Sequence, residues 1–172
     1  MSGPMTSEQI LAALKQAIQA EVEGHHFYLM AARTTSDPKG REIFERLAAE
    51  ELEHMTHLRA QYQAVLESGA PDGSLSLGAP RTLRGDSPIF TEGLKARAGE
   101  AHFEMTALSV GVQLEMQAER FYRSQAGACG DAGLAAFWNE LADWESGHYH
   151  ALLTQQEYLK EDYWHENSFS PF

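Results

Sequence analysis

Cysteine is almost absent from this sequence: the 172 residues include one, Cys129. A single cysteine cannot form a disulfide within the chain, and no Cys-x-x-Cys pair is present to hold zinc or iron through sulfur. The sequence also lacks a phosphate-binding glycine loop, a dinucleotide fingerprint and the serine elbow of hydrolases. Any redox chemistry must therefore use nitrogen and oxygen ligands, and we expect no haem, flavin or nucleotide cofactor.

Basic residues and long apolar runs are scarce as well. The chain has 13 lysines and arginines against 25 acidic residues, a net charge of -12, which disfavours attraction to nucleic acid or anionic lipid. The longest apolar run, Phe27 to Ala32, is far too short to span a bilayer, and the first residues show no basic region followed by an apolar stretch, so we expect no export signal. We expect a cytoplasmic protein with neither a membrane nor a nucleic acid as partner.

Apolar residues recur at alternating steps of three and four, which predicts long amphipathic helices. The first helix begins at a capping box formed by Thr6 and Gln9. The second begins at Asp37, followed by proline at the first helical position. These two helices predict a hairpin over residues 7–67.

A second predicted hairpin covers residues 103–160. Residues 68–102 are rich in glycine, proline and serine and predict one long crossover between the hairpins. Residues 161–172 form an aromatic tail that we expect to pack on the bundle or on a neighbouring subunit. The whole chain, residues 1–172, is thus predicted to be one all-α domain, a four-helix bundle with a crossover connection.

The second hairpin repeats the first without a gap. The matched positions, each pair 94 residues apart, include Glu21 and Glu115, Tyr28 and Tyr122, Asp37 and Asp131, Glu51 and Glu145, and His54 and His148. Duplication of one hairpin explains this constant offset and predicts two halves facing each other about a pseudo-twofold axis. A site built by one half should be mirrored by the other.

Polar residues interrupt the apolar faces of all four helices. They are two Glu-x-x-His pairs and one glutamate on each remaining helix, namely Glu21, Glu51, His54, Glu115, Glu145 and His148. A buried carboxylate without a partner costs several kcal/mol or is neutralised, and no lysine or arginine shares these faces. Four carboxylates would balance two divalent cations, and carboxylate with imidazole suits iron or manganese better than magnesium or calcium.

The same motifs resemble those of the ferritin-like superfamily, and of rubrerythrins in particular. They are Glu21 with Phe27 and Tyr28, the segment Ala48 to His54, Glu115 with Phe121 and Tyr122, and Glu145 to His148. The resemblance implies a ferritin-like bundle with a di-iron centre ligated by the six residues named above. It also implies a non-haem di-iron oxidoreductase that reduces hydrogen peroxide or dioxygen, with no catalytic residue beyond the ligands. Manganese or a mixed metal pair stays open, because the ligand types serve both metals.

Two features depart from the rubrerythrin pattern. No cysteine-ligated rubredoxin segment is present, so the resemblance implies an external electron-donor protein. Rubrerythrins carry an extra glutamate at the position of Ala118. The chain instead has Glu119 one residue later, and His25 at the matched position of the first hairpin. These two residues could be extra ligands, groups that contact the ligands, or partners of each other or of water. Tyr28 and Tyr122 follow a ligand by seven residues and are candidates to hydrogen-bond metal-bound glutamates, or else to fill the core.

Two alternative functions share these sequence features. One is iron storage, with the same centre acting as a ferroxidase that feeds mineral inside a closed shell. The short aromatic tail does not favour the fifth helix that ferritin cages use, and we expect a symmetric homodimer. The other is a metal-free helical scaffold in which the buried carboxylates are protonated.

Overall fold

The structure is a computed structural model that describes residues 5–80 and 88–168. Within these ranges the chain is helical and contains no strand. Its elements are α1 (Ser7–Thr34), α2 (Pro38–Ser68), α3 (Glu92–Lys95), the 3-10 turn η1 (Ala98–Glu100), α4 (His102–Ala128) and α5 (Ala132–Glu166).

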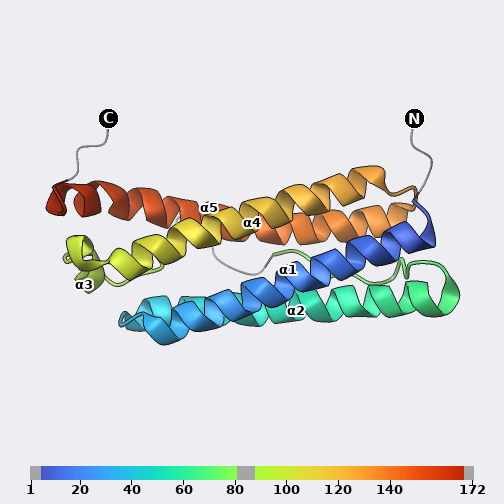
Figure 1. The fold of residues 1–172 in the computed structure, drawn as a ribbon, viewed down its shortest axis with the longest axis horizontal. Coiled ribbons are helices and arrows are strands. Elements are labelled where there is room, and N and C mark those ends of the chain that lie inside the picture. The colour runs from blue at the N-terminus through green and yellow to red at the C-terminus, as the bar shows by residue number, and fades with distance from the viewer. Residues whose placement is uncertain (1–4, 81–87, 169–172) are drawn as a thin grey trace.

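The long helices form two antiparallel hairpins, α1 with α2 and α4 with α5, which lie against each other along their length (Figure 1). The short α3 lies at the end of the bundle opposite the point where α2 stops (Figure 1). The chain between the hairpins must therefore travel the length of the bundle. This arrangement confirms the predicted all-α bundle of two hairpins joined by a long crossover.

Local signals in the sequence set the helix ends where they were expected. The Gln9 N–H donates to the Thr6 hydroxyl at 3.3 Å, and the Thr6 N–H donates to the Gln9 side chain at 2.9 Å, which completes the capping box. Asp37 and Asp131 each accept a backbone hydrogen bond from the first turn of the helix that follows. Gly69 ends α2 with a φ of 76°, a left-handed conformation that glycine adopts without strain.

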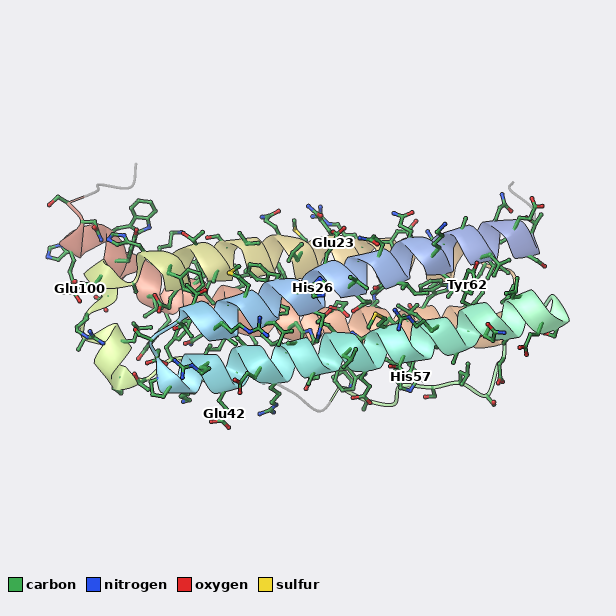
Figure 2. All side chains as sticks on the ribbon, turned by 60° about the horizontal axis from the view of Figure 1, so that its bottom comes forward. Glu23, His26, Glu42, His57, Tyr62 and Glu100 are labelled. Atoms are coloured by element: carbon green, nitrogen blue, oxygen red, sulfur yellow. The ribbon has the colours of Figure 1, made fainter. Side chains whose placement is uncertain are left out.

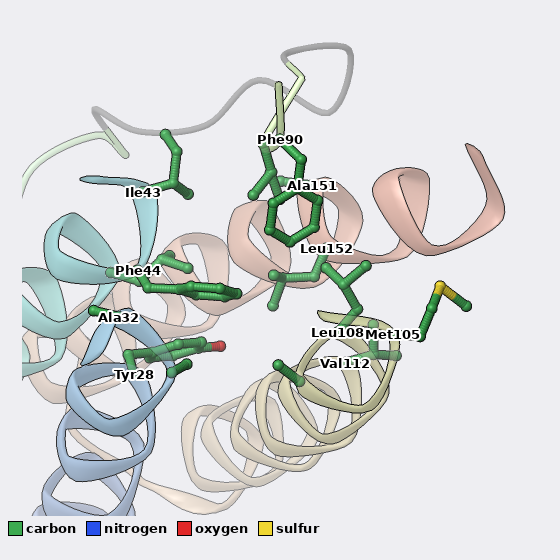
Figure 3. Packing of buried hydrophobic residues seen from close by; sticks show 14 of the residues in the cluster. Tyr28, Ala32, Ile43, Phe44, Phe90, Met105, Leu108, Val112, Ala151 and Leu152 are labelled. Carbon is green, nitrogen blue, oxygen red and sulfur yellow. The ribbon is translucent and has the colours of Figure 1, made fainter. Parts of the chain in front are cut away.

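Apolar packing forms two clusters. The first includes Tyr28, Phe44, Leu108 and Leu152, which meet between the two hairpins (Figure 3). The second includes Leu14, Leu58, Trp138 and Leu141. Along every long helix the predicted ligands fall between residues of the first cluster and residues of the second. The polar layer is thus held between two packed apolar regions that fix the helices around it.

Helix α5 continues to Glu166, past the predicted end at Lys160. The extension packs on the start of the second hairpin, where the Tyr163 hydroxyl and His102 Nδ1 lie 2.8 Å apart and the Gly99 N–H donates to Glu166 at 2.7 Å. These contacts hold the helical turns after Lys160 against the bundle. Part of the predicted tail is therefore helix packed on the bundle.

The crossover contains α3 and η1, two short helical segments that the sequence did not predict. Thr91 caps α3 by accepting the N–H of Leu94. Residues 81–87 of the crossover and residues 169–172 of the tail lie outside the described residues. No helix in the described part of the chain combines the length and hydropathy needed to cross a membrane.

Candidate metal centre

The six predicted ligands converge in the middle of the bundle. They form two overlapping groups, in each of which one ligand atom per residue lies within 4.8 Å of the others. We name the first group the His54 position and the second the His148 position. The His54 position comprises Glu21, Glu51, His54 and Glu145, and the His148 position comprises Glu51, Glu115, Glu145 and His148. All six side chains are buried, with at most 4% of any residue exposed.

Glu51 and Glu145 belong to both groups and therefore lie between the two positions. His54 Nδ1 is 2.8 Å from a Glu145 oxygen and 3.3 Å from a Glu21 oxygen. His148 Nδ1 is 3.3 Å from a Glu51 oxygen and 3.6 Å from oxygens of Glu115 and Glu145. The two imidazole rings stack with centroids 5.9 Å apart. Each hairpin thus contributes one glutamate shared by both positions, one glutamate used once, and one histidine.

Two buried tyrosines link the hairpins across this layer. The Tyr28 hydroxyl donates to Glu115, and the Tyr122 hydroxyl donates to Glu21. In both cases a tyrosine from one hairpin holds the unshared glutamate of the other. This is the hydrogen-bonding role considered for the tyrosines from sequence, and their rings also pack in the apolar clusters.

His26 and His57 lie on the outer side of the bundle, away from this layer (Figure 2). His25 is half-buried and its Nδ1 lies 2.7 Å from the Ala48 carbonyl oxygen, so its ring hydrogen bonds to the backbone of α2. Glu119 is also half-buried. Among the described residues, neither His25 nor Glu119 belongs to the groups of converging ligand atoms.

Sequence reasoning missed Glu50. Only 9% of this residue is exposed, and its Oε2 accepts a hydrogen bond from His148 Nε2 at 2.8 Å. A carboxylate at this place fixes the orientation of the ring and the nitrogen that carries the proton. The signal was available, since Glu50 lies three residues after Leu47 and four before His54, at the edge of the apolar face of α2.

Burial and mutual repulsion perturb the carboxyl groups. Burial raises the pKa of Glu51 well above its ordinary value, and repulsion from Glu145 and Glu115 adds to the rise. Burial likewise raises the pKa of Glu115 to about 8. Burial also opposes ionisation of Glu145, but attraction to His54 outweighs it and holds the pKa of this carboxyl group well below normal. For His54 and His148 burial lowers the pKa, yet the surrounding carboxylates raise it well above 6.5. Without a metal ion this cluster retains protons.

Several atoms of the cluster are unsatisfied. Although ring nitrogens and carboxylate oxygens lie close together, their alignment is poor for hydrogen bonding. The buried atoms without a hydrogen-bond partner among the described residues include Glu51 Oε1, both carboxylate oxygens of Glu145, and His148 Nδ1. Buried polar atoms in native proteins are nearly always satisfied, so this concentration indicates a missing partner. Oxygen and imidazole lone pairs converging from four helices suit iron or manganese ions.

A pocket of about 170 Å³ connects this cluster with the surface between α1 and α4. The exposed Gln16 and Gln117 line it together with the buried carboxylates. Gly24 and Ala118, which occupy matched positions of the repeat, also line the pocket. A Cβ at Gly24 would lie 3.0 Å from Glu51 Oε2. Small side chains at both positions therefore leave the approach to the carboxylates open.

Comparison with known proteins gives a family for the first hairpin. Residues 12–79 match the model of the rubrerythrin family. No curated protein and no solved structure matches the chain. The matched segment holds Glu21, Glu51 and His54, and the second hairpin presents the same residue types 94 positions later. The rubrerythrin match and the helical architecture together place the chain in the ferritin-like superfamily.

Proposed function

We propose that this protein is a di-iron oxidoreductase of the rubrerythrin type that reduces hydrogen peroxide or dioxygen. The observation that carries the proposal is the pair of overlapping four-residue groups, buried and containing unsatisfied ligand atoms. The residues that would hold the two ions are Glu21, Glu51, His54, Glu115, Glu145 and His148. A ferrous pair bound by these side chains supplies two electrons, enough with two protons to convert peroxide into two water molecules.

The shared glutamates keep the two positions together. Because Glu51 and Glu145 enter both groups, a displacement of either side chain changes both positions. Tyr28 and Tyr122 restrain the remaining two glutamates from the opposite hairpin, so the ligand set depends on the hairpins staying docked. The packed clusters on either side exclude water from the ends of the layer.

The pocket between α1 and α4 provides the route by which a small oxidant reaches the site. Its lining combines the site carboxylates with Ala20, Leu114 and Phe121, and no lysine or arginine among the described residues lines it. A neutral molecule such as peroxide or dioxygen meets no electrostatic barrier there, whereas an anion would be repelled by Glu23 and by the carboxylates.

Other components of the reaction come from outside the chain. With one cysteine the sequence cannot form a sulfur-ligated iron site, so an external electron-donor protein would restore the ferrous state. A symmetric homodimer and a cytoplasmic location are further parts of the proposal. Manganese, or one ion of each metal, fits the same donor atoms.

The test is anaerobic loading of the metal-free protein with two ferrous ions per chain, followed by rapid mixing with peroxide. We expect oxidation much faster than that of free ferrous ion at the same concentration. Glu145→Ala should abolish the acceleration, whereas Glu45→Gln, at an exposed position of α2, should retain it. Oxidation no faster than in free solution would refute the enzymatic proposal.

Size-exclusion chromatography then separates the proposal from iron storage. A dimer or tetramer cannot enclose mineral, so a small assembly excludes the storage alternative. A large closed shell that retains iron beyond two ions per chain would favour storage instead.

A further inference from the structure

The two histidines of the site differ in what surrounds their outer nitrogens, although the repeat places them at equivalent positions. His148 Nε2 donates to Glu50 Oε2 at 2.8 Å, and Glu50 is largely buried between the hairpins. Glu50 also lies 4.0 Å from the guanidinium of Arg46, a contact that leaves its Oε2 directed at His148. His148 is therefore part of a carboxylate–histidine pair.

The equivalent of Glu50 in the second hairpin, 94 residues later, is Trp144. Its indole N–H donates to the Gly78 carbonyl oxygen at 3.1 Å, and its ring meets that of His54 edge-on, with centroids 5.3 Å apart. An indole has no lone pair with which to accept an N–H hydrogen bond. In the described part of the chain, His54 Nε2 has no hydrogen-bond partner. The repeat is thus broken at the position of Glu50, which orients His148.

In both rings Nδ1 faces the ligand cluster, and the difference determines whether this nitrogen has a free lone pair. Coordination of a metal ion requires a neutral imidazole, in which one nitrogen donates and the other accepts. The bond to Glu50 places the His148 hydrogen on Nε2, so its Nδ1 faces Glu51 and Glu115 as an acceptor. His54 Nδ1 instead hydrogen bonds to Glu21 at 3.3 Å, which places the hydrogen on the nitrogen that a metal ion would need. His148 Nδ1 can therefore coordinate a metal ion directly. For His54 to do so, the hydrogen must first move from Nδ1 to Nε2, which has no hydrogen-bond partner among the described residues.

We propose that the two metal positions are unequal and fill in order, the His148 position first and the His54 position second, with Glu50 as the positioning residue that sets the order. The inference rests on the proposed function in that it takes the six residues as ligands. Loss of a carboxylate behind a metal-bound histidine commonly weakens metal affinity by about 10- to 100-fold. We expect a difference of that size between the two positions. At low metal concentration such a centre holds one ion at the His148 position. A different metal ion can then bind at the His54 position, which would give a mixed pair.

The test uses Mn²⁺ as the probe, titrated into the metal-free protein and followed by electron paramagnetic resonance. Up to one equivalent, the wild-type protein should give the six-line signal of an isolated ion, and the signal of a coupled pair should grow only beyond it. Ordered filling alone does not identify the positions, because a first ion at either one reduces the charge of the shared glutamates. Two matched variants therefore remove one histidine each.

His54→Ala should retain the first binding step with its affinity unchanged, whereas His148→Ala should bind its first ion about 10- to 100-fold more weakly than wild type. Equal first-step affinities in these two variants would overturn the inference while leaving the proposed function intact. If wild-type protein binds no Mn²⁺ and no Fe²⁺, the proposed function fails together with the inference.

Glu50→Gln tests the assigned cause and leaves all six ligands in place. The first step should weaken by about 10-fold or more while the second changes little. The control Glu45→Gln removes the same charge from an exposed position of α2 and should leave both steps unchanged. If Glu50→Gln retains wild-type affinity in the first step, or weakens both steps equally, Glu50 does not set the order.

Discussion

Replacing Glu115 with glutamine should stabilise the metal-free protein at neutral pH and lower its affinity for metal ions. The carboxyl group is 2% exposed, and burial raises its pKa to about 8 from a usual value of 4.5. The folded state therefore binds this proton more tightly than the unfolded state does. Stability from this group is fully present below pH 4.5 and is lost as the pH rises to about 8.

The size of the effect follows from linkage. One pKa unit corresponds to about 1.4 kcal/mol, so at pH 7 the carboxyl group has lost roughly 3 kcal/mol of the stability that it contributes in acid. Glutamine has nearly the same shape, does not ionise, and keeps an oxygen that accepts the Tyr28 hydroxyl. Glu115→Gln should therefore raise the free energy of unfolding by about 3 kcal/mol at pH 7 and by less than about 1 kcal/mol near pH 5.

Urea unfolding in the presence of a chelator, repeated from pH 5 to pH 8, measures this difference. Adding Mn²⁺ should remove most of the difference, because saturation of a site at a hundredfold excess over its dissociation constant adds about 2.7 kcal/mol to the wild-type protein, and the variant lacks one ligand. Glu119→Gln, a half-buried position of the same helix, serves as the control. The reasoning is refuted if Glu115→Gln lowers the stability of the metal-free protein equally at pH 5 and pH 7.

Four further substitutions test other parts of the site. Tyr28→Phe or Tyr122→Phe removes the hydroxyl that donates to a buried glutamate and should cost about 1–3 kcal/mol in urea unfolding at pH 7; unchanged stability would show that these bonds contribute nothing. Gly24→Ala places a Cβ 3.0 Å from Glu51 Oε2 and should weaken Mn²⁺ binding without loss of helix content by circular dichroism, so full affinity would contradict the close approach. Ala118→Leu narrows the pocket and should slow peroxide oxidation of the ferrous protein in stopped-flow mixing while two ions still bind; an unchanged rate would mean that the oxidant enters elsewhere.

Most of the fold follows from local features of the sequence. Capping residues such as Thr6 and Asp37 begin helices at defined positions, and the apolar face that follows each cap determines which side is buried. The constant offset of 94 residues predicts two equivalent hairpins. The extension of α5 beyond Lys160 could not be predicted this way, because it depends on contacts with η1 that are distant in sequence.

The candidate site also contains residues that the sequence predicts and residues that it does not. Its six candidate ligands are recognisable because charged residues on an apolar face require a partner, and the repeat identifies them twice. The role of Glu50 was not predicted from the sequence because this residue lies at the edge of the apolar face of α2, where a glutamate is normally solvated. Only the three-dimensional placement of His148 reveals that role. His25 lies on the seam in sequence, but a carbonyl of α2 satisfies its ring, a contact that no spacing rule anticipates.

The most direct measurement of the central claim is anomalous diffraction at the iron absorption edge from crystals of the iron-loaded protein. We expect two strong peaks per chain inside the bundle, one beside His54 and one beside His148, with Glu51 and Glu145 between them. Peaks confined to the molecular surface, or an interior without a peak in protein that has been saturated with iron, would contradict it.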